Sequence, residues 1–395
     1  MQSMINQLIS QNVKSASEQA SGAGEKLFNA IVKRAQEFRD HGKLADSQQK
    51  ISSENYQILK QLKFFSALVP EQFGGQNVSF SQMCGVLVQL AKLHPSTALS
   101  CSMHQHIMAA TRYNSINGRP GQALLEKILA NELVLISTGA GDWLASSGEM
   151  QKVDGGFCLN ATKHFASGST EGDLLMTSAP FNHPEHGWQV LHFPVSMSAD
   201  GVNVLDNWQP MGMKGTGSNS VELNNVFVAE ETVGMTRPRG DFHSVYNVVL
   251  PIASAMIMSV YVGIAELAAE RALQRVKASD DPVTPYLLGE MQNALTTAQV
   301  ILKDMVSIVD EFNFETSLSL VNMSVTRKTL VANACTQVVE KAVEVCGGPG
   351  YLEFAGIECL LCDVRASSFH PLQEKRQLLF SGSLAMGKQP PSQAF

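Results

Sequence analysis

The stretch MGMKGTGSNSVELNNVFV, residues 211–228, decides the fold class of this chain. A segment rich in glycine and serine leads there into the β-rich run SVELNNVFV. The residues before it hold five more such runs: LVLIS, FCLN, LLMTSA, WQVLHFPV and VNVL. Gly, Asn, Asp and Pro separate the runs, and Asp154-Gly155-Gly156 has the composition of a hairpin turn. Six short strands at this spacing predict a compact barrel or sandwich over residues 133–238.

Helical patterns flank this β-domain on both sides. In residues 1–132, the positions i, i+3, i+4, i+7 and i+8 are held by Met83, Val86, Leu87, Leu90 and Ala91. In residues 239–395, one apolar face of a long helix is formed by Leu287, Met291, Ala294, Leu295, Ala298, Leu302, Met305 and Val309. A second long pattern ends at Gly347-Gly348, as at a helix C-terminus. The order predicts an α+β multidomain chain with an N-terminal α-helical domain, a middle β-domain and a C-terminal four-helix bundle.

One segment has the composition of a membrane helix. Val248–Ala265 carries no charge, and its length is near the threshold of about 18 residues for a spanning helix. A helix that is apolar on all sides also suits the central rod of a bundle. We expect the buried rod and no membrane.

Charge and cysteine content limit the classes of partner, the location and the metal sites that we expect. The formal net charge of −7 argues against nucleic acid or an anionic membrane as a partner. The first 25 residues hold no apolar core of a signal peptide, and seven scattered cysteines are typical of reduced thiols in a cytoplasmic protein. Cys359 and Cys362 form one C-x-x-C that could be a redox pair. No second pair accompanies it, so we expect packing cysteines and no metal site.

Five segments, in this order, resemble motifs of the acyl-CoA dehydrogenase superfamily. They are ALVPEQFGG (67–75), STGAGDWLASSG (137–148), ATKHFASG (161–168), MGMKGTGSNSVELNNVFV (211–228) and CGGPGY (346–351). The resemblance runs over nearly the whole chain and implies the same three-part fold and a bound flavin.

Three sets of residues would contact the flavin. Backbone N–H groups of a glycine-rich turn suit the polar edge of the ring, at Thr138, Gly139 and Gly141. An aromatic side chain and a hydroxyl suit its face, at Phe165, Ala166 and Ser167. Close backbone approach suits a phosphate or pyrophosphate, at Gly347, Gly348 and Gly350. Taken singly, each set could equally be an ordinary turn.

The resemblance also tests for dehydrogenase chemistry, which requires a general base. Most of the family places a Glu eight residues after the Asp of an Arg-Asp pair. Here that pair is Cys362-Asp363, and the eighth residue is Pro371, preceded by His370. A second position used in the family, counted back from Gly263, holds Ala253. Neither of these two positions holds a side chain that can act as the general base of a dehydrogenase.

A branch of the family that resembles dibenzothiophene monooxygenase uses other residues. Its members receive reduced flavin from a separate reductase and use O2 to oxygenate a substrate. They carry a His in the N-terminal domain, a Ser or Thr after the flavin-facing strand, and a His in the C-terminal segment. By resemblance, the catalytic residues here are His104, Ser167 and His370, although His106 or His164 could replace His104.

The cofactor form follows from another family motif. FAD-dependent dehydrogenases carry RxQFGxP…Q, which holds the adenine half. The matching stretch here, RVKASDDPVTPYL, retains only Arg275 and Pro282. This favours FMN over FAD.

The sequence therefore predicts a flavin-dependent oxidoreductase, with a reduced-flavin monooxygenase favoured. Its substrate would be small, apolar and aromatic or heteroatom-containing, indole-like compounds being one candidate. An NAD(P)H–flavin reductase would be its partner. An acyl-CoA dehydrogenase with a relocated base is the alternative, and a flavin-free ligand-binding relative is a third. The apolar surface of Val248–Ala265 and Leu287–Val309 predicts a homotetramer or dimer.

Overall fold

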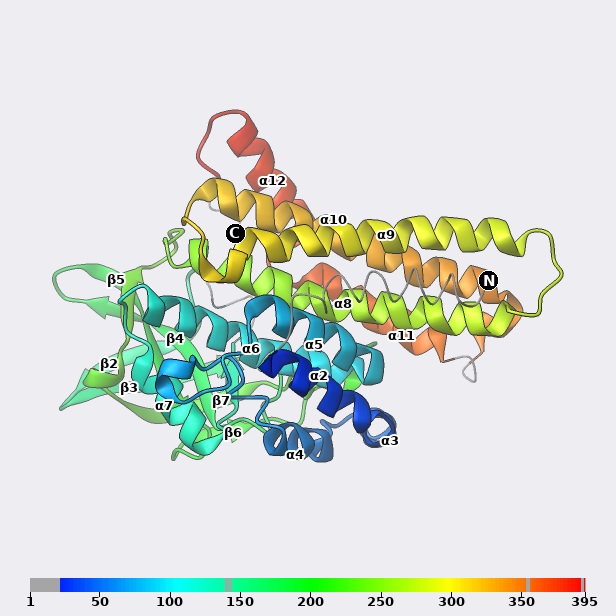
Figure 1. Ribbon diagram of the computed structural model, residues 1–395. Coiled ribbons are helices and arrows are strands. Elements are labelled where there is room, and N and C mark those ends of the chain that lie inside the picture. The colour runs from blue at the N-terminus through cyan, green and yellow to red at the C-terminus, as the bar shows by residue number, and fades with distance from the viewer. Residues whose placement is uncertain (1–21, 139–141, 143, 353–355, 392–393, 395) are drawn as a thin grey trace.

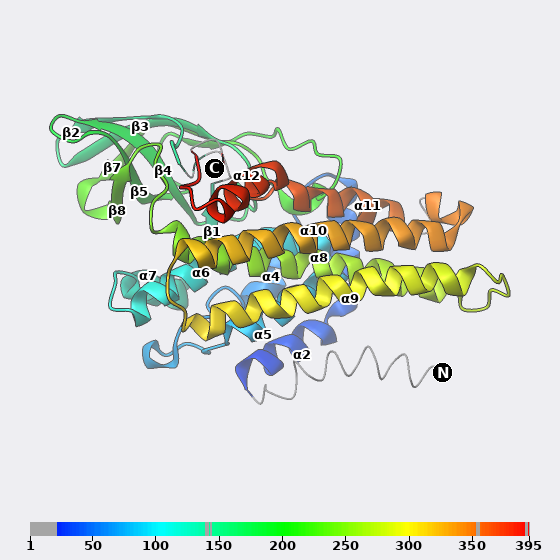
Figure 2. The same ribbon diagram turned by 90° about the horizontal axis from the view of Figure 1, so that it is seen from above.

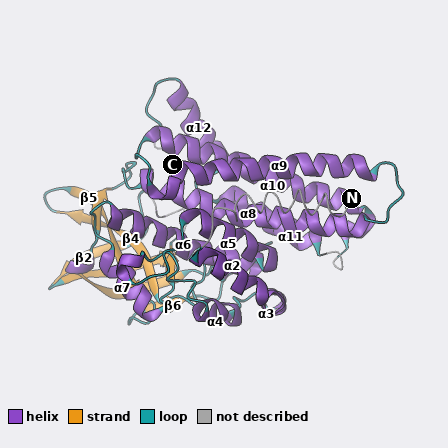
Figure 3. Cartoon of the chain, in the orientation of Figure 1, coloured by secondary structure: helices purple, strands orange, loops and turns teal. Residues whose placement is uncertain are grey.

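The computed structural model describes residues 22–138, 142, 144–352, 356–391 and 394 of the chain. Helices at the N-terminal side, two β-sheets and a second set of helices follow one another along the chain (Figure 1). The strands gather at one end of the molecule, and long helices extend from them to the other end (Figure 3). The predicted fold class is confirmed.

The N-terminal part consists of helices. They are α2 (Ala23–Lys33), α3 (Ala35–Ser47), α4 (Ser53–Gln61), α5 (Phe80–Leu93), α6 (Pro95–Ile116) and α7 (Gln122–Asn131). Helix α5 starts with a capping box, in which Ser79 and Gln82 satisfy each other's backbone N–H groups. Its predicted apolar face is buried. Pro95 cannot continue α5 but fits the first turn of α6, where His94 is the cap.

The middle part holds two four-stranded sheets. One has the order β1 (Leu135–Ser137), β4 (Leu174–His183), β5 (Gly187–Ser196), β8 (Met235–Pro238). The other has the order β2 (Glu149–Val153), β3 (Gly156–Lys163), β7 (Val221–Ala229), β6 (Val202–Val204). The predicted hairpin is present, because Val153 pairs with Gly156 across Asp154-Gly155. Strands β2 and β8 were not among the six predicted runs.

The C-terminal part is built on α8 (Tyr246–Val276), α9 (Thr284–Val309) and α10 (Leu318–Cys346). Two shorter helices, α11 (Ile357–Arg365) and α12 (Glu374–Ala385), lie against α10 (Figure 2). In the described residues, three helices of the predicted four-helix bundle are long. The fourth position beside α8 and α10 belongs to α11, which has only 9 residues.

Helix α8 is the shared core of the molecule. It packs on α5 and α6 from the N-terminal part and on α9 and α10 from the bundle. Among the described residues it is the one helix long and apolar enough to cross a membrane, but 89% of its most apolar window is buried in the molecule. This agrees with the predicted central rod. The β-domain meets this core through β1, which lies against α6.

Candidate functional site

The segment after β3 and the segment before β7 form one structural unit. Their backbones are joined at three places, where Ala166 N donates to Asn219 O at 3.1 Å, Gly168 N to Thr216 O at 2.8 Å, and Ser169 N to Gly217 O at 3.3 Å. Two motifs that lie about fifty residues apart in the sequence therefore come together.

Ser167 and Phe165 lie on this unit. The Ser167 hydroxyl is 2.8 Å from that of Ser218, which is 2.8 Å from the hydroxyl of Thr216. Phe165 has a positive φ of 57° and leaves 61% of its surface exposed. Trp208 approaches it edge to face, with ring centroids 6.1 Å apart. An apolar ring so exposed, in a conformation that non-glycine residues rarely adopt, is typical of a binding position.

A cavity of about 240 Å³ opens beside Phe165. It is lined by His164, Phe165, Asn207, Trp208, Gln209, Pro210, Ser218 and Ser220. Aromatic faces and neutral hydroxyls around one cavity fit a planar, polar-edged ring such as that of a flavin. Trp208 and Asn207 were not among the predicted site residues. The sequence signal was weak, since they precede the glycine-rich stretch in an irregular loop.

The residues predicted to meet the polar edge of the flavin are described only in part. Thr138 follows β1 directly and is partly buried. Gly139 and Gly141 lie outside the described residues. Strand β1 pairs in parallel with β4, which fixes where Thr138 leaves the sheet.

A buried lysine directly precedes the segment that holds Phe165 and Ser167. Lys163, at the end of β3, is fully buried and contacts the Asp142 carboxylate at 3.1 Å. Its ammonium also donates to the backbone oxygens of Ser147 and Ser178, each at 2.7 Å. Burial lowers the pKa of Lys163, and Asp142 partly opposes this. The arrangement ties the segment that follows Gly141 to two strands of the β-domain.

His104 lies on α6 with both ring nitrogens bonded to backbone. Nε2 is 2.8 Å from Phe65 O, and Nδ1 accepts from Leu135 N at 2.9 Å. Its side chain is 1% exposed, and burial lowers its pKa to about 4. This geometry gives His104 a positioning role between α6 and β1. The catalytic role that the sequence predicted remains a prediction, without a free ring nitrogen to support it.

His370 is held between the helices of the bundle. It follows the short 3₁₀ helix Ala366–Phe369, and its Nε2 lies 2.7 Å from the hydroxyl of Tyr261 on α8. Burial lowers the pKa of His370 to about 3, and the charges of Lys328 and His106 act in the same direction. Of the two histidines of α6, it is therefore His106 and not His104 that lowers the pKa of His370.

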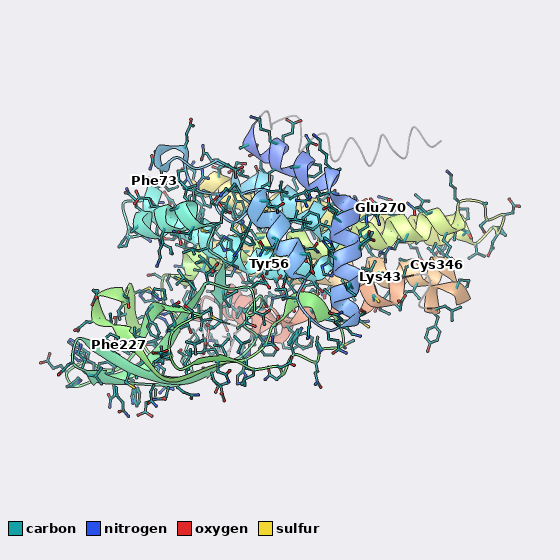
Figure 4. The ribbon with its side chains drawn as sticks, turned by 90° about the horizontal axis from the view of Figure 1, so that it is seen from below. Lys43, Tyr56, Phe73, Phe227, Glu270 and Cys346 are labelled. Carbon is teal, nitrogen blue, oxygen red and sulfur yellow. The ribbon has the colours of Figure 1, made fainter. Side chains whose placement is uncertain are left out.

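The glycines predicted to approach a phosphate lie elsewhere. Gly347 ends α10, and Gly348 and Gly350 belong to the 3₁₀ helix Gly348–Tyr351. This end of α10, marked by Cys346 in Figure 4, lies at the opposite end of the molecule from the β-domain, marked by Phe227. Within one chain these glycines do not meet Phe165. At Gly350, a Cβ would lie 2.6 Å from Val343 O, so packing alone requires glycine there.

The sequence also raised the possibility of a redox pair at Cys359 and Cys362. Cys359 and Cys362 are free thiols, and the pKa of Cys359 is raised to about 12 by burial and by Glu358. Such a thiol is a poor nucleophile at neutral pH. Within the described part of the chain, no group of His, Cys, Asp and Glu could hold a metal ion.

Comparison with known families and proteins identifies the superfamily of this chain. Residues 27–130 match the acyl-CoA dehydrogenase N-terminal domain, and residues 248–374 match the acyl-CoA dehydrogenase C-terminal domain. The chain is 26% identical over 351 residues to the dibenzothiophene monooxygenase of Rhodococcus qingshengii, covering 77% of this chain and 80% of that protein. It is 24% identical over 333 residues to the cyclohex-1-ene-1-carbonyl-CoA dehydrogenase of Syntrophus aciditrophicus, covering 79% and 77%.

The fold is shared with a solved structure of dibenzothiophene monooxygenase from Paenibacillus sp. A11-2, in complex with FMN and indole. The TM-score is 0.79 at 16% identity, over 93% of this chain and 98% of that one. Two family domains, in the order that the motifs predicted, account for the helices on both sides of the β-domain. The chain belongs to the acyl-CoA dehydrogenase superfamily of flavin-dependent oxidoreductases.

Proposed function

We propose that this chain is a reduced-flavin-dependent monooxygenase that binds FMN and inserts one oxygen atom of O2 into a small apolar or aromatic molecule. The observation that carries the proposal is the surroundings of His370. At the place where the resemblance puts the dehydrogenase base there is a neutral imidazole, bonded to Tyr261. The titratable groups that act on its pKa are Lys328 and His106, and neither is a carboxylate. Such a site favours hydrogen-bond donation over removal of an α-proton from a thioester.

The residues of the cavity suit a bound FMN. Phe165 would stack on the ring, and the Ser167 hydroxyl would bond to a polar ring atom while Ser218 holds that hydroxyl in place. When bound in its reduced form, the flavin supplies two electrons, so that one oxygen atom enters the substrate and the other leaves as water. The FMN bound by the Paenibacillus enzyme supports this cofactor.

Dibenzothiophene and indole, named with the relatives, support a heteroaromatic substrate. A separate NAD(P)H–flavin reductase would supply the reduced FMN, and a cytoplasmic location accords with the free cysteines.

We also propose a homotetramer or dimer, for a reason other than the one drawn from the sequence. The apolar surface of α8 is buried within one chain. Large apolar side chains of the C-terminal part are instead exposed: Tyr351 at 85%, Leu352 at 49%, Phe369 at 71%, Leu378 at 51% and Met386 at 67%. A second chain would bury them. A monomer in light scattering at micromolar concentration would contradict this.

The alternative function is an acyl-CoA dehydrogenase with a relocated base, which the Syntrophus relative supports. One experiment separates the two. The FMN-loaded protein is reduced without oxygen, mixed with ¹⁸O2 and indole or dibenzothiophene, and the products are analysed by mass spectrometry. One ¹⁸O atom per product molecule is expected. Bleaching of the oxidised protein by butyryl- or palmitoyl-CoA, with no ¹⁸O in any product, would establish the dehydrogenase instead. A protein that binds no flavin would contradict both.

A further inference from the structure

We infer that Tyr261 fixes the tautomer of His370 and that Lys328 holds the backbone two residues beyond it, at Leu372, so that His370 offers an Nδ1–H donor to a bound molecule. The inference rests on the proposed function, because it assigns the parts of the site that orient the imidazole. Tyr261 and Lys328 are positioning residues.

The bond between Tyr261 and His370 has one favourable polarity. Tyr261 is completely buried in the middle of α8, and burial raises its pKa well above 10, so it keeps its proton. His370 is neutral at physiological pH because its pKa is about 3. A phenol is a good donor and a neutral imidazole nitrogen a good acceptor. The 2.7 Å bond therefore runs from the Tyr261 hydroxyl to Nε2 of His370, which leaves the ring proton on Nδ1.

The other ring nitrogen remains available. In the described part of the chain, the bond to Tyr261 is the hydrogen bond that the His370 side chain makes. The residue is partly buried, and its Nδ1 is not sealed off from solvent. With the opposite tautomer, Nδ1 would be an acceptor and could not donate to a bound oxygen atom. The orientation of one phenol thus decides whether this site donates a proton or accepts one.

The backbone beside His370 is held by a different helix. Lys328, on α10, is 2% exposed, and its ammonium donates to Leu372 O at 3.2 Å. His370 itself is extended, with φ −68° and ψ 146°. The ring is thus fixed from α8 and the chain from α10. These two helices pack against each other along the bundle.

Burial is the main reason that the imidazole stays neutral, and nearby charge adds to this effect. Lys328 lies on α10 and His106 on α6, and both lower the pKa of His370. Glu374, at the start of α12, raises the pKa of Lys328, while burial lowers it to about 8. Lys328 is therefore mostly charged at pH 7. Protonation of His370 would bring a second buried cation close to it.

The direct test is the tautomer itself, read by solid-state NMR of protein labelled with ¹⁵N-histidine. The chain has 10 histidines, and the signal that disappears in His370→Gln identifies this one. The wild type should show protonated Nδ1 and unprotonated Nε2, with and without FMN. Tyr261→Phe should convert a large part of it to the other tautomer. Tyr113→Phe, a second buried tyrosine outside the site, should leave it unchanged. Protonated Nε2 in the wild type would overturn the inference without any variant.

The second readout is coupling, measured as product formed per O2 consumed. Tyr261→Phe should lower it about tenfold or more, since a misplaced acid loses much of a general-acid contribution of about 10²–10⁴. O2 consumption by the reduced FMN protein should stay within twofold, with hydrogen peroxide making up the difference. Lys328→Met should raise the pKa of His370 in the NMR titration, whereas Lys328→Arg should not. Unchanged coupling in Tyr261→Phe despite a changed tautomer would remove the assigned role.

The two proposals fail separately. If the tautomer behaves as inferred but no oxygenated product forms from any substrate, the monooxygenase function is wrong and the positioning of His370 stands. If product forms but Tyr261→Phe changes neither tautomer nor coupling, the positioning is wrong and the function stands.

Discussion

Replacing Lys163 by Met should destabilise the protein by about 3–5 kcal/mol, because it leaves a buried carboxylate without its counter-charge. The Lys163 side chain is 0% exposed and that of Asp142 10%, so solvent screens this pair very little. Met keeps the aliphatic stem and removes only the ammonium. The oxygens of Ser147 and Ser178 lose a donor at the same time, although Ser178 O keeps the hydroxyl of Ser146.

The magnitude can be separated into its parts by a double-mutant cycle. Asp142→Asn in the Lys163→Met background removes the stranded charge and should recover a substantial part of the loss. Lys152→Met is the matched control, since its ion pair with Glu230 is exposed and should contribute less than about 1 kcal/mol. Asp142 directly follows the predicted flavin loop, so Lys163→Met should also weaken FMN binding.

The assay is urea unfolding followed by near-ultraviolet circular dichroism and by fluorescence. Coincident transitions by the two probes are required before a free energy is extracted. If Lys163→Met loses no more stability than Lys152→Met, or if the effects of Asp142→Asn and Lys163→Met simply add, the buried pair does not contribute as reasoned.

Three further predictions concern flavin binding, acid sensitivity and close packing. Phe165→Ala should raise the FMN dissociation constant about 2- to 13-fold, the equivalent of about 0.5–1.5 kcal/mol for an aromatic contact. Fluorescence titration measures this, and Phe227→Ala, equally exposed in the same domain, should change nothing. Acid should destabilise the fold as the pH falls below about 6.5, because four histidines have a folded-state pKa of about 3 to 4, below the unfolded value: His104, His106, His192 and His370. Each contributes up to about 1.4 kcal/mol per pH unit of lost stability between the two pKa values, and a flat denaturation midpoint from pH 7 to 5 would contradict this. Gly212→Ala should lower the free energy of unfolding by about 1–3 kcal/mol, since its Cβ would lie 2.3 Å from the backbone of Cys362. Gly234→Ala is the control for this urea unfolding measurement: its Cβ meets open space, so the free energy should hardly change.

The fold could be predicted from the sequence where many residues repeat one period. The apolar faces of α5 and α9 and the uncharged run of α8 are such cases, and most of their residues are buried. Strand β2 gave no signal because only Met150 of its five residues is buried. Strand β8 is only four residues long and carries a buried arginine. Helix α11 was not predicted as a separate element, because apolar spacing over only 9 residues does not establish a helix.

The candidate site was harder, because its geometry depends on partners far along the chain. His104 and His370 are both plausible histidines in sequence. Only the fold shows that His104 is already bonded to Phe65 and Leu135, which lie 39 and 31 residues away. Tyr261 went unnoticed because it lies inside a run whose apolar character was its main feature. Ser167 and Phe165 could be proposed from the sequence because their motif is specific, whereas their contacts with Ser218 and Trp208 required the fold.

The central place of α8 has a consequence for synthesis of the protein. Helices α5 and α6 are complete at residue 116, but the helix that covers their apolar faces begins at Tyr246. At a translation rate of about 5–20 residues per second, those faces wait roughly 6–26 s for their partner to be made. During that interval the apolar faces of α5 and α6 lack this partner, so association with other nascent chains competes with folding.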